Sequence, residues 1–257
     1  MPSIFISGGA AGIGLATAKR FGAQGWTVGV YDVDAEALKA VKKEHPEFIT
    51  GKLDVRKPAQ WAKALAEFTA HTDGKLDVLD NNAGVLVGGR LDSISPDAVQ
   101  AQIDIDVLGV TLGAQAAYPY LKATPGAHLV NIASASAIYG QPDIATYSAA
   151  KFYVAGLTEA LELEWQADDI RVVAIWPLWA KTALADADTK SAKTLGIRIT
   201  PEQVADRIWT SVHPKAADKV IHRTHYSVGV QTTVLNNASK VVPNFVSRLV
   251  NKAIAQN

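Results

Sequence analysis

The chain has 257 residues, of which 48% are hydrophobic, and its 25 basic residues balance 25 acidic ones. This length is compatible with one α/β domain, and the balanced charge gives no indication of nucleic acid as a partner. Because the sequence contains no cysteine, disulfides, thiolate nucleophiles and cysteine metal sites are excluded, and no metal site is expected. Neither a secretion signal nor an apolar stretch of membrane-spanning length is recognisable, so a cytoplasmic location is predicted.

Short apolar runs rich in β-branched residues alternate along the chain with longer segments of helical periodicity. The predicted strands are residues 3–7, 26–32, 48–54, 76–81, 128–134, 170–176 and 219–223. The predicted helices are residues 12–24, 34–44, 58–70, a long segment ending near Lys122, 146–166 and a helix beginning at about Thr200. Strands separated by helix-length crossovers pair in parallel, with helices on both faces of the sheet. The sequence therefore predicts an α/β fold, a doubly wound parallel sheet of about seven strands.

The domain organisation is simple, because the chain shows no repeat, low-complexity linker or composition break. One domain over residues 1–257 is predicted, with a divergent and partly helical tail over about 225–257. In the tail, apolar residues recur at helical spacing over 244–255 and predict an amphipathic helix. The body of the domain or a second subunit is the expected partner of its apolar face, and membrane surface is a minor alternative, because only two residues of the polar face are basic.

A glycine-rich turn, SGGAAGIG, follows the first predicted strand directly, with Gly8, Gly12 and Gly14 in it. A turn from strand into helix needs glycine where φ is positive or where a phosphate approaches the backbone, and a helix N-terminus favours an anion. The spacing is not the G-x-G-x-x-G form, so a plain tight turn is the alternative at this point.

An acidic residue, Asp32, ends the second predicted strand 18 residues after Gly14. A carboxylate at this place can accept both hydroxyls of an adenosine ribose. A 2′-phosphate would be repelled, and neither Ala11 nor Val33 supplies a compensating cation, so NAD is predicted as cofactor in preference to NADP. The alternative for Asp32 is a cap of the helix that begins at Asp34.

Three further motifs follow in order, namely NNAG at 81–84, Ser134, and YSAAK at 147–151. With the glycine turn and Asp32, this ordered set resembles the short-chain dehydrogenase/reductase family over almost the whole chain through about residue 222. The resemblance implies a Rossmann-type fold and a single dinucleotide-binding and catalytic domain. By the same resemblance, the cofactor is bound by Gly8, Gly12, Ile13, Gly14, Asp32, Asp54, Val55, Asn82, Ala83, Gly84, Tyr147, Lys151, Pro177 and Thr182.

Tyr147 and Lys151 are four residues apart and therefore share one face of the predicted helix. A solvated surface pair is one interpretation. The other is that Lys151 and the positive nicotinamide ring lower the pKa of the phenol, so that Tyr147 acts as general acid/base. Ser134 would then donate a hydrogen bond to the substrate oxygen. Taken alone, Ser134 could also be a satisfied hydroxyl at a strand end, and Asn81 and Asn82 could serve turn geometry.

Four places differ from the family pattern. Asp80 replaces an aliphatic residue in a buried strand and needs a partner there. Leu178 replaces a glycine and, with Trp179, adds bulk beside the nicotinamide. The last predicted strand lacks D-G-G. Asp106 stands where an asparagine completes the proton relay, and its charge is expected to move alcohol oxidation to more alkaline pH.

The predicted function is hydride transfer between NAD(H) and a hydrophobic secondary alcohol or ketone, with Ser134, Tyr147, Lys151 and Asp106 as catalytic residues. An NADPH-dependent ketoacyl-type reductase and a non-catalytic dinucleotide-binding protein are the alternatives. A small apolar alcohol or ketone is the expected partner, together with other copies of the chain in a homodimer or homotetramer, and membrane binding is not expected. Residues expected to shape an apolar substrate cleft are Leu86, Val87, Ile138, Tyr139, Leu178, Trp179, Leu184 and Leu195.

Overall fold

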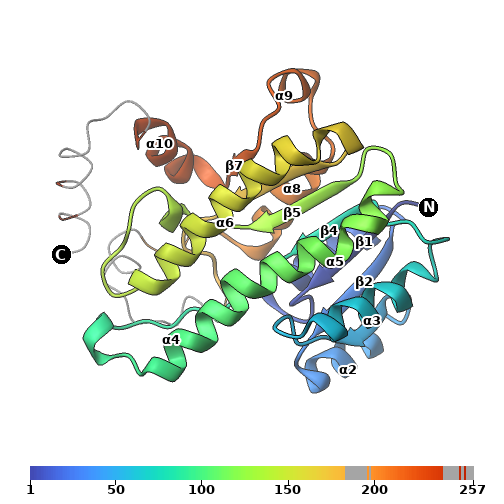
Figure 1. Cartoon of the computed structure of the whole chain (residues 1–257), viewed down its shortest axis with the longest axis horizontal. Helices are drawn as coiled ribbons and strands as arrows, with labels where there is room; N and C mark the ends of the chain where they lie inside the picture. The colour runs from blue at the N-terminus through green and yellow to red at the C-terminus, as the bar shows by residue number, and fades with distance from the viewer. Residues whose placement is uncertain (183–195, 197, 240–248, 250–251, 253–257) are drawn as a thin grey trace.

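The computed structural model describes residues 1–182, 196, 198–239, 249 and 252, which form an α/β structure around one sheet (Figure 1). The sheet has seven strands, all parallel, in the order β3-β2-β1-β4-β5-β6-β7. The strands are β1 Ser3–Ser7, β2 Thr27–Asp32, β3 Ile49–Lys52, β4 Val78–Asn81, β5 His128–Ile132, β6 Arg171–Trp176 and β7 His225–Ser227. The helices are α1 Gly12–Gly22, α2 Ala35–Glu44, α3 Pro58–Thr69, α4 Pro96–Ile103, α5 Val110–Lys122, α6 Ala145–Glu164, α8 Pro201–Val212, α9 Ala216–Val220 and α10 Gly229–Ser239.

The strand order reverses at β1. From β1 the chain moves outward through β2 to the edge strand β3, and it then crosses back to place β4 on the other side of β1. Ser7, the last residue of β1, lies between Tyr31 of β2 and Asn81 of β4. The connections after β1 and β4 diverge from this point, which leaves a crevice at the carboxyl ends of the strands.

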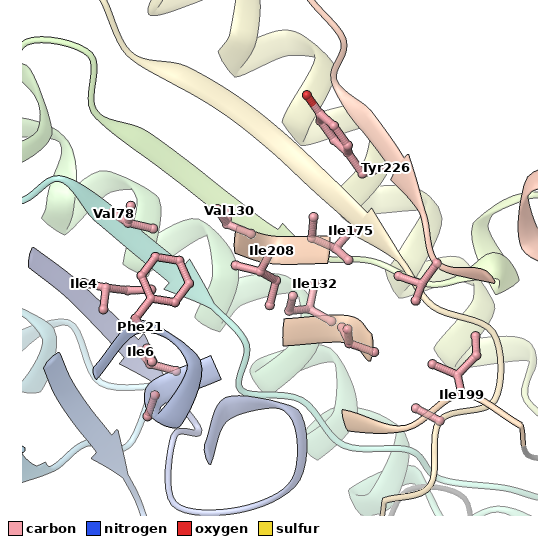
Figure 2. Packing of buried hydrophobic residues seen from close by; sticks show 14 of the residues in the cluster. Ile4, Ile6, Phe21, Val78, Val130, Ile132, Ile175, Ile199, Ile208 and Tyr226 are labelled. Atoms are coloured by element: carbon pink, nitrogen blue, oxygen red, sulfur yellow. The ribbon is translucent and has the colours of Figure 1, made fainter. Parts of the chain in front are cut away.

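The sheet is buried on both faces, as parallel sheets are. Ile4 and Ile6 of β1 face the side covered by α1, α2 and α8, where Phe21 and Ile208 complete one apolar core (Figure 2). Phe5 faces the opposite side, where the other large core is covered by α3 and α5. In Figure 1, α5 and α6 run in front of the sheet. The predicted alternation of strands and helices therefore gives one sheet with an apolar core on each face.

The long segment before β5 is a helix with one widened turn. Helix α4 begins after Ser95, whose hydroxyl accepts a hydrogen bond from Ala98 N, and α5 ends at Lys122, as predicted. Between them, residues Asp104–Gly109 form a π-helical turn. Such turns are frequent at functional sites, and this one contains the buried residue Asp106.

The predicted last strand, 219–223, is wrong. Residues Ala216–Val220 form helix α9, and the last strand is β7, which pairs with β6. Val220 is 80% exposed and Ile221 is 63% exposed, whereas Tyr226 of β7 is 2% exposed. The predicted strand rested on two adjacent apolar residues, Val220 and Ile221, and so short an apolar run occurs both at an exposed helix end and in a buried edge strand.

In the described part of the tail, helix α10 follows β7. The amphipathic segment predicted over 244–255 lies almost entirely outside the described residues. Before the tail, α8 begins after Thr200 as predicted, with reciprocal hydrogen bonds between Thr200 and Gln203 that form a capping box.

Candidate active site

The glycine turn after β1 is shaped by close approaches that exclude side chains. Gly8 has φ +64°, and a Cβ atom on it would lie 2.7 Å from Ala83 Cα. A Cβ atom on Gly14 would lie 2.4 Å from the carbonyl oxygen of Gly8. Gly12 has φ +52° and begins α1. The turn therefore brings backbone N–H groups of a helix N-terminus to the edge of the crevice.

A cavity of about 410 Å³ occupies the crevice at the carboxyl ends of the strands. Of the residues predicted to bind cofactor or substrate, those that line it are Gly8, Gly12, Ile13, Asp32, Asp54, Val55, Asn82, Ala83, Gly84, Ser134, Tyr147, Lys151, Pro177 and Thr182. Gly14 and Asp106 do not line the cavity. Gly14 packs behind the turn against Gly8 and Asn82, and Asp106 lies behind Gly84.

Asp32 is held at the end of β2 by two backbone groups. Its Oδ2 atom accepts a hydrogen bond from Ala10 N, and its Oδ1 atom accepts one from Asp34 N, both at 3.1 Å. The cap of α2 is Asp34, whose side chain accepts from Glu36 N and Ala37 N. The alternative in which Asp32 caps this helix is therefore wrong, and its carboxylate faces the cavity.

One cation was missed at this end of the cavity. Arg56 lines it, and its guanidinium donates to both oxygens of Asp54 at 2.8 Å. This ion pair lowers the pKa of Asp54. Lys52 is the register partner of Asp32 on β3, but its exposed side chain does not line the cavity. The prediction from the sequence compared only Ala11 and Val33, which adjoin the motifs. It did not include Lys52 at the end of β3 or Arg56 after it.

The two asparagines of NNAG have separate roles. Asn82 donates to the carbonyl oxygens of Ser7 at 3.1 Å and Gly8 at 2.8 Å, so it joins the ends of β1 and β4 below the glycine turn. Asn81 donates to Val110 O and to Asn131 Oδ1 within the protein interior. Asn82 therefore shapes the cavity, and Asn81 holds α5 and β5 against β4.

Tyr147 and Lys151 lie on the buried face of α6, with 8% and 4% of their surfaces exposed. The Lys151 Nζ atom lies 5.3 Å from the centroid of the Tyr147 ring and donates to Ile132 O at 3.0 Å. Ser134 lines the same cavity at the end of β5, and its hydroxyl lies 3.0 Å from that of Ser136. The interpretation of Tyr147 and Lys151 as a solvated surface pair is therefore wrong.

The balance of effects on Tyr147 differs from the sequence-based expectation. Burial raises the pKa of Tyr147, and the negative charge of Asp106 raises it further. Lys151 and the Ser134 hydroxyl lower this pKa, but burial is the largest effect and the pKa lies above its ordinary value. The phenol of the cofactor-free protein is therefore protonated at neutral pH, and a further positive charge is needed to favour the phenolate.

Asp106 interacts with Lys151 from behind the cavity wall. A Cβ atom on Gly84 would lie 3.0 Å from Asp106 Oδ1 and 3.6 Å from Lys151 Nζ. Asp106 Oδ1 accepts from Val85 N at 2.9 Å. Burial raises the pKa of Asp106, while Lys151 and the Val85 N–H lower it. The side chain thus holds the backbone of the NNAG turn and places a carboxyl group beside the lysine.

The apolar wall is smaller than predicted. Leu86, Leu178 and Trp179 line the cavity, whereas Val87, Ile138 and Tyr139 do not. Val87 N donates to the buried side chain of Gln102 at 3.1 Å. Leu184 and Leu195 lie outside the described residues. Sequence reasoning missed Ser136 and Gln141, which line the cavity together with Ser134.

The Asp80 carboxyl group has no hydrogen-bond partner in the described part of the chain, contrary to the expectation that it needs one. The residue is fully buried in β4 between Ile6 and Val130, and neither carboxyl oxygen has a hydrogen-bond partner among the described residues. Burial raises the pKa of Asp80 well above its usual range. Loss of charge, rather than an ion pair, allows a carboxyl group in this core.

A doubly wound parallel sheet with a glycine turn after β1 and an acidic residue at the end of β2 is typical of a dinucleotide-binding protein. The family model described as short chain dehydrogenase matches residues 2–193. The chain is 33% identical over 187 residues to a 3alpha-hydroxysteroid dehydrogenase of Mediterraneibacter gnavus. The matched region covers 71% of this chain and 75% of that protein. The chain belongs to the short-chain dehydrogenase family and is an oxidoreductase that acts on CH–OH groups.

Solved structures agree with this assignment. A 3-ketoacyl-(acyl-carrier-protein) reductase from Brucella melitensis, complexed with NADH, matches with a TM-score of 0.80 and 25% identity, over 88% of this chain and 96% of that one. A gluconate 5-dehydrogenase from Burkholderia cenocepacia, in complex with NADP and tartrate, matches with a TM-score of 0.78 and 25% identity, over 91% and 95% of the two chains. None of the described helices is long and apolar enough to cross a membrane, and the described residues contain no cluster of three potential metal ligands.

Proposed function

We propose that the protein transfers a hydride between NAD(H) and a hydrophobic secondary alcohol or ketone, with Tyr147 as the general acid/base. The observation that carries this proposal is the convergence of Ser134, Tyr147 and Lys151 in one cavity with the glycine turn and Asp32. These residues come from four separate elements. Their meeting in one cavity therefore favours a reaction site over the non-catalytic alternative.

The residues present fit a dinucleotide. Gly8, Gly12 and Ile13 line the cavity at the N-terminus of α1, so the backbone of the turn is available to a pyrophosphate there. Asp32 would hold the adenosine ribose, Asp54 and Val55 would flank the adenine, and Pro177 and Thr182 would border the nicotinamide. When bound, the cofactor supplies or accepts the hydride.

The chain's own residues move the proton. Ser134 donates to the substrate oxygen and stabilises the charge that develops on it. Tyr147 gives a proton to that oxygen in reduction and takes one in oxidation. Lys151 stabilises the phenolate, and a bound positive nicotinamide ring adds to the field that offsets the burial of Tyr147.

NAD is the proposed cofactor because Asp32 lines the cavity and has no ion-pair partner within 4 Å in the described part of the chain. Arg56 lines the cavity and could in principle compensate the charge of a 2′-phosphate, but its guanidinium donates two hydrogen bonds to Asp54. The Brucella melitensis reductase binds NADH and the Burkholderia cenocepacia dehydrogenase binds NADP, so both cofactors must be compared.

The proposed substrates are apolar alcohols and ketones, which the wall of Leu86, Leu178 and Trp179 favours. The relatedness to a hydroxysteroid dehydrogenase supports this class. The likeness to a 3-ketoacyl-(acyl-carrier-protein) reductase keeps a ketoacyl-type reductase as the second candidate. The cytoplasmic location, the single-domain assignment and the homo-oligomeric state stay predictions.

The proposal is tested by measuring absorbance at the reduced-nicotinamide band with a panel of cyclic and linear secondary alcohols and ketones. NAD and NADH should support turnover of apolar members with higher kcat/KM than NADP and NADPH. Turnover only of ketoacyl thioesters, with NADPH, would favour the second candidate. Binding of NADH without turnover of any member would favour a non-catalytic protein.

A further inference from the structure

Gln141 is a buried polar residue that neither the fold nor the reaction described above uses. It lies in the loop between the turn Ala135–Ala137 and α6, with 4% of its surface exposed, and it lines the cavity with Ser134 and Tyr147. Its Oε1 atom has no hydrogen-bond partner among the described residues. A buried amide oxygen left unpaired is unfavourable, so a group that binds it is expected.

The loop holds Gln141 in place through its backbone rather than its side chain. Gln141 N donates to Ser148 Oγ at 3.1 Å, and Ser148 follows Tyr147 directly on α6. The backbone of Gln141 is thus anchored to the helix that carries Tyr147. A structural role would require a protein partner for the amide oxygen, and the described chain provides none.

We propose that Gln141 binds a second oxygen function of the substrate, a neutral hydroxyl group, so that the substrate is a hydroxylated alcohol or ketone. This inference rests on the proposed function and narrows its substrate class. An amide presents both a donor and an acceptor, and a hydroxyl group complements either orientation.

A carboxylate is disfavoured as the bound group. Among the described residues that line the cavity, the basic side chains are Arg56 and Lys151. Arg56 is paired with Asp54 near the predicted adenine site, and Lys151 donates to Ile132 O beside Tyr147. Neither is left to neutralise a second negative charge near Gln141, whereas a hydroxyl needs no cation. The remaining lining of Leu86, Leu178 and Trp179 suits the hydrocarbon part of such a substrate.

The test compares cyclohexanol with the 1,2-, 1,3- and 1,4-cyclohexanediols, because the ring holds the second hydroxyl at a different distance from the reacting carbon in each isomer. kcat/KM for oxidation with NAD is measured for wild type, Gln141→Leu and Tyr139→Phe. Tyr139 is the matched control, since its hydroxyl is also buried without a hydrogen-bond partner in the described structure but does not line the cavity.

In the wild type, at least one diol should exceed cyclohexanol in kcat/KM by about tenfold, which corresponds to about 1.4 kcal/mol for one hydrogen bond in a buried site. Gln141→Leu should remove that ratio, and Tyr139→Phe should keep it. The ratio is measured within each variant, so it does not depend on the fraction of folded protein.

Oxidation of cyclohexanol with no diol preferred would overturn the role of Gln141 and leave the proposed function standing. A diol preference that survives Gln141→Leu would overturn it as well. If none of the four alcohols is oxidised, the proposed function fails for this substrate class, and the inference fails with it.

Discussion

Asp106 offers a test of the electrostatics at the reaction site. In alcohol oxidation, Tyr147 accepts a proton, so the rate rises with pH through the pKa of the phenol. The charge of Asp106 raises that pKa. Asp106→Asn removes the charge while keeping the shape and the oxygen that accepts from Val85 N. The substitution should therefore lower the pKa of Tyr147 and move the rising limb to lower pH.

The magnitude follows from the geometry. Lys151 Nζ lies 5.3 Å from the Tyr147 ring centroid, and a Cβ atom on Gly84 would lie within 4 Å of both Lys151 Nζ and Asp106 Oδ1. For charges separated by about 10 Å in an effective dielectric constant of about 20, the repulsion is about 1.5 kcal/mol, or roughly one pH unit. Burial raises the pKa of Asp106, and Lys151 and the Val85 N–H offset part of this rise. The expected displacement of the limb requires Asp106 to be ionised in this pH range.

The assay is the initial rate of alcohol oxidation against pH at saturating NAD, with circular dichroism to check the fold. Asp104→Asn is the matched control, because Asp104 lies in the same π-helical turn and does not line the cavity. It should move the limb less than Asp106→Asn does. An unmoved limb, or one displaced to higher pH by Asp106→Asn, would refute the assigned interaction.

Three other changes have defined outcomes. Asp32→Ala combined with Val33→Arg should shift the ratio of NADPH to NADH affinity toward NADPH, as measured by fluorescence titration, and wild type that binds NADPH more tightly would contradict the role of Asp32. Asp80→Leu should stabilise the protein by about 2 kcal/mol, or about 4–8 °C in melting temperature. Because the pKa of Asp80 is raised in the folded state, the free energy of unfolding of the wild type falls as pH rises above the pKa of Asp80 in the unfolded chain. The stability gained by Asp80→Leu should therefore grow from acidic to neutral pH. A gain that does not depend on pH would contradict an uncharged Asp80. Deletion from Pro243 onward should change the oligomeric state or cause aggregation, and an unchanged light-scattering mass and melting temperature would show that the tail is dispensable.

The sequence predicted the fold well where local patterns were strong. The first six strands and the crossover helices were recognised because apolar β-branched runs and helical periodicity alternate over long segments. The last strand was misplaced because β7 has three residues, whose burial depends on pairing with β6 rather than on a local pattern. The π-helical turn at Asp106 could not be foreseen either, since its sequence reads as ordinary helix.

The candidate site was predictable to the extent that spacing places residues together. Tyr147 and Lys151 share a helix face at four-residue spacing, and Ser134 and Asp32 end parallel strands, so their approach at one sheet edge followed from the topology. Gln141 and Arg56 carried no comparable signal, because their positions depend on loop geometry. The dominance of burial in setting the pKa of Tyr147 also required the surrounding packing to be known.

The most direct test of the central claim is to compare wild type with Tyr147→Phe, a change that removes only the phenolic oxygen. Both proteins are titrated with NADH by fluorescence, and kcat is then measured with the best alcohol of the panel at saturating NAD. The account predicts equal NADH affinity within about threefold and a loss of kcat of about 10²–10⁴-fold, as expected when a general acid/base is removed. Retention of kcat within about tenfold by Tyr147→Phe would contradict the assignment of Tyr147 as the group that moves the proton.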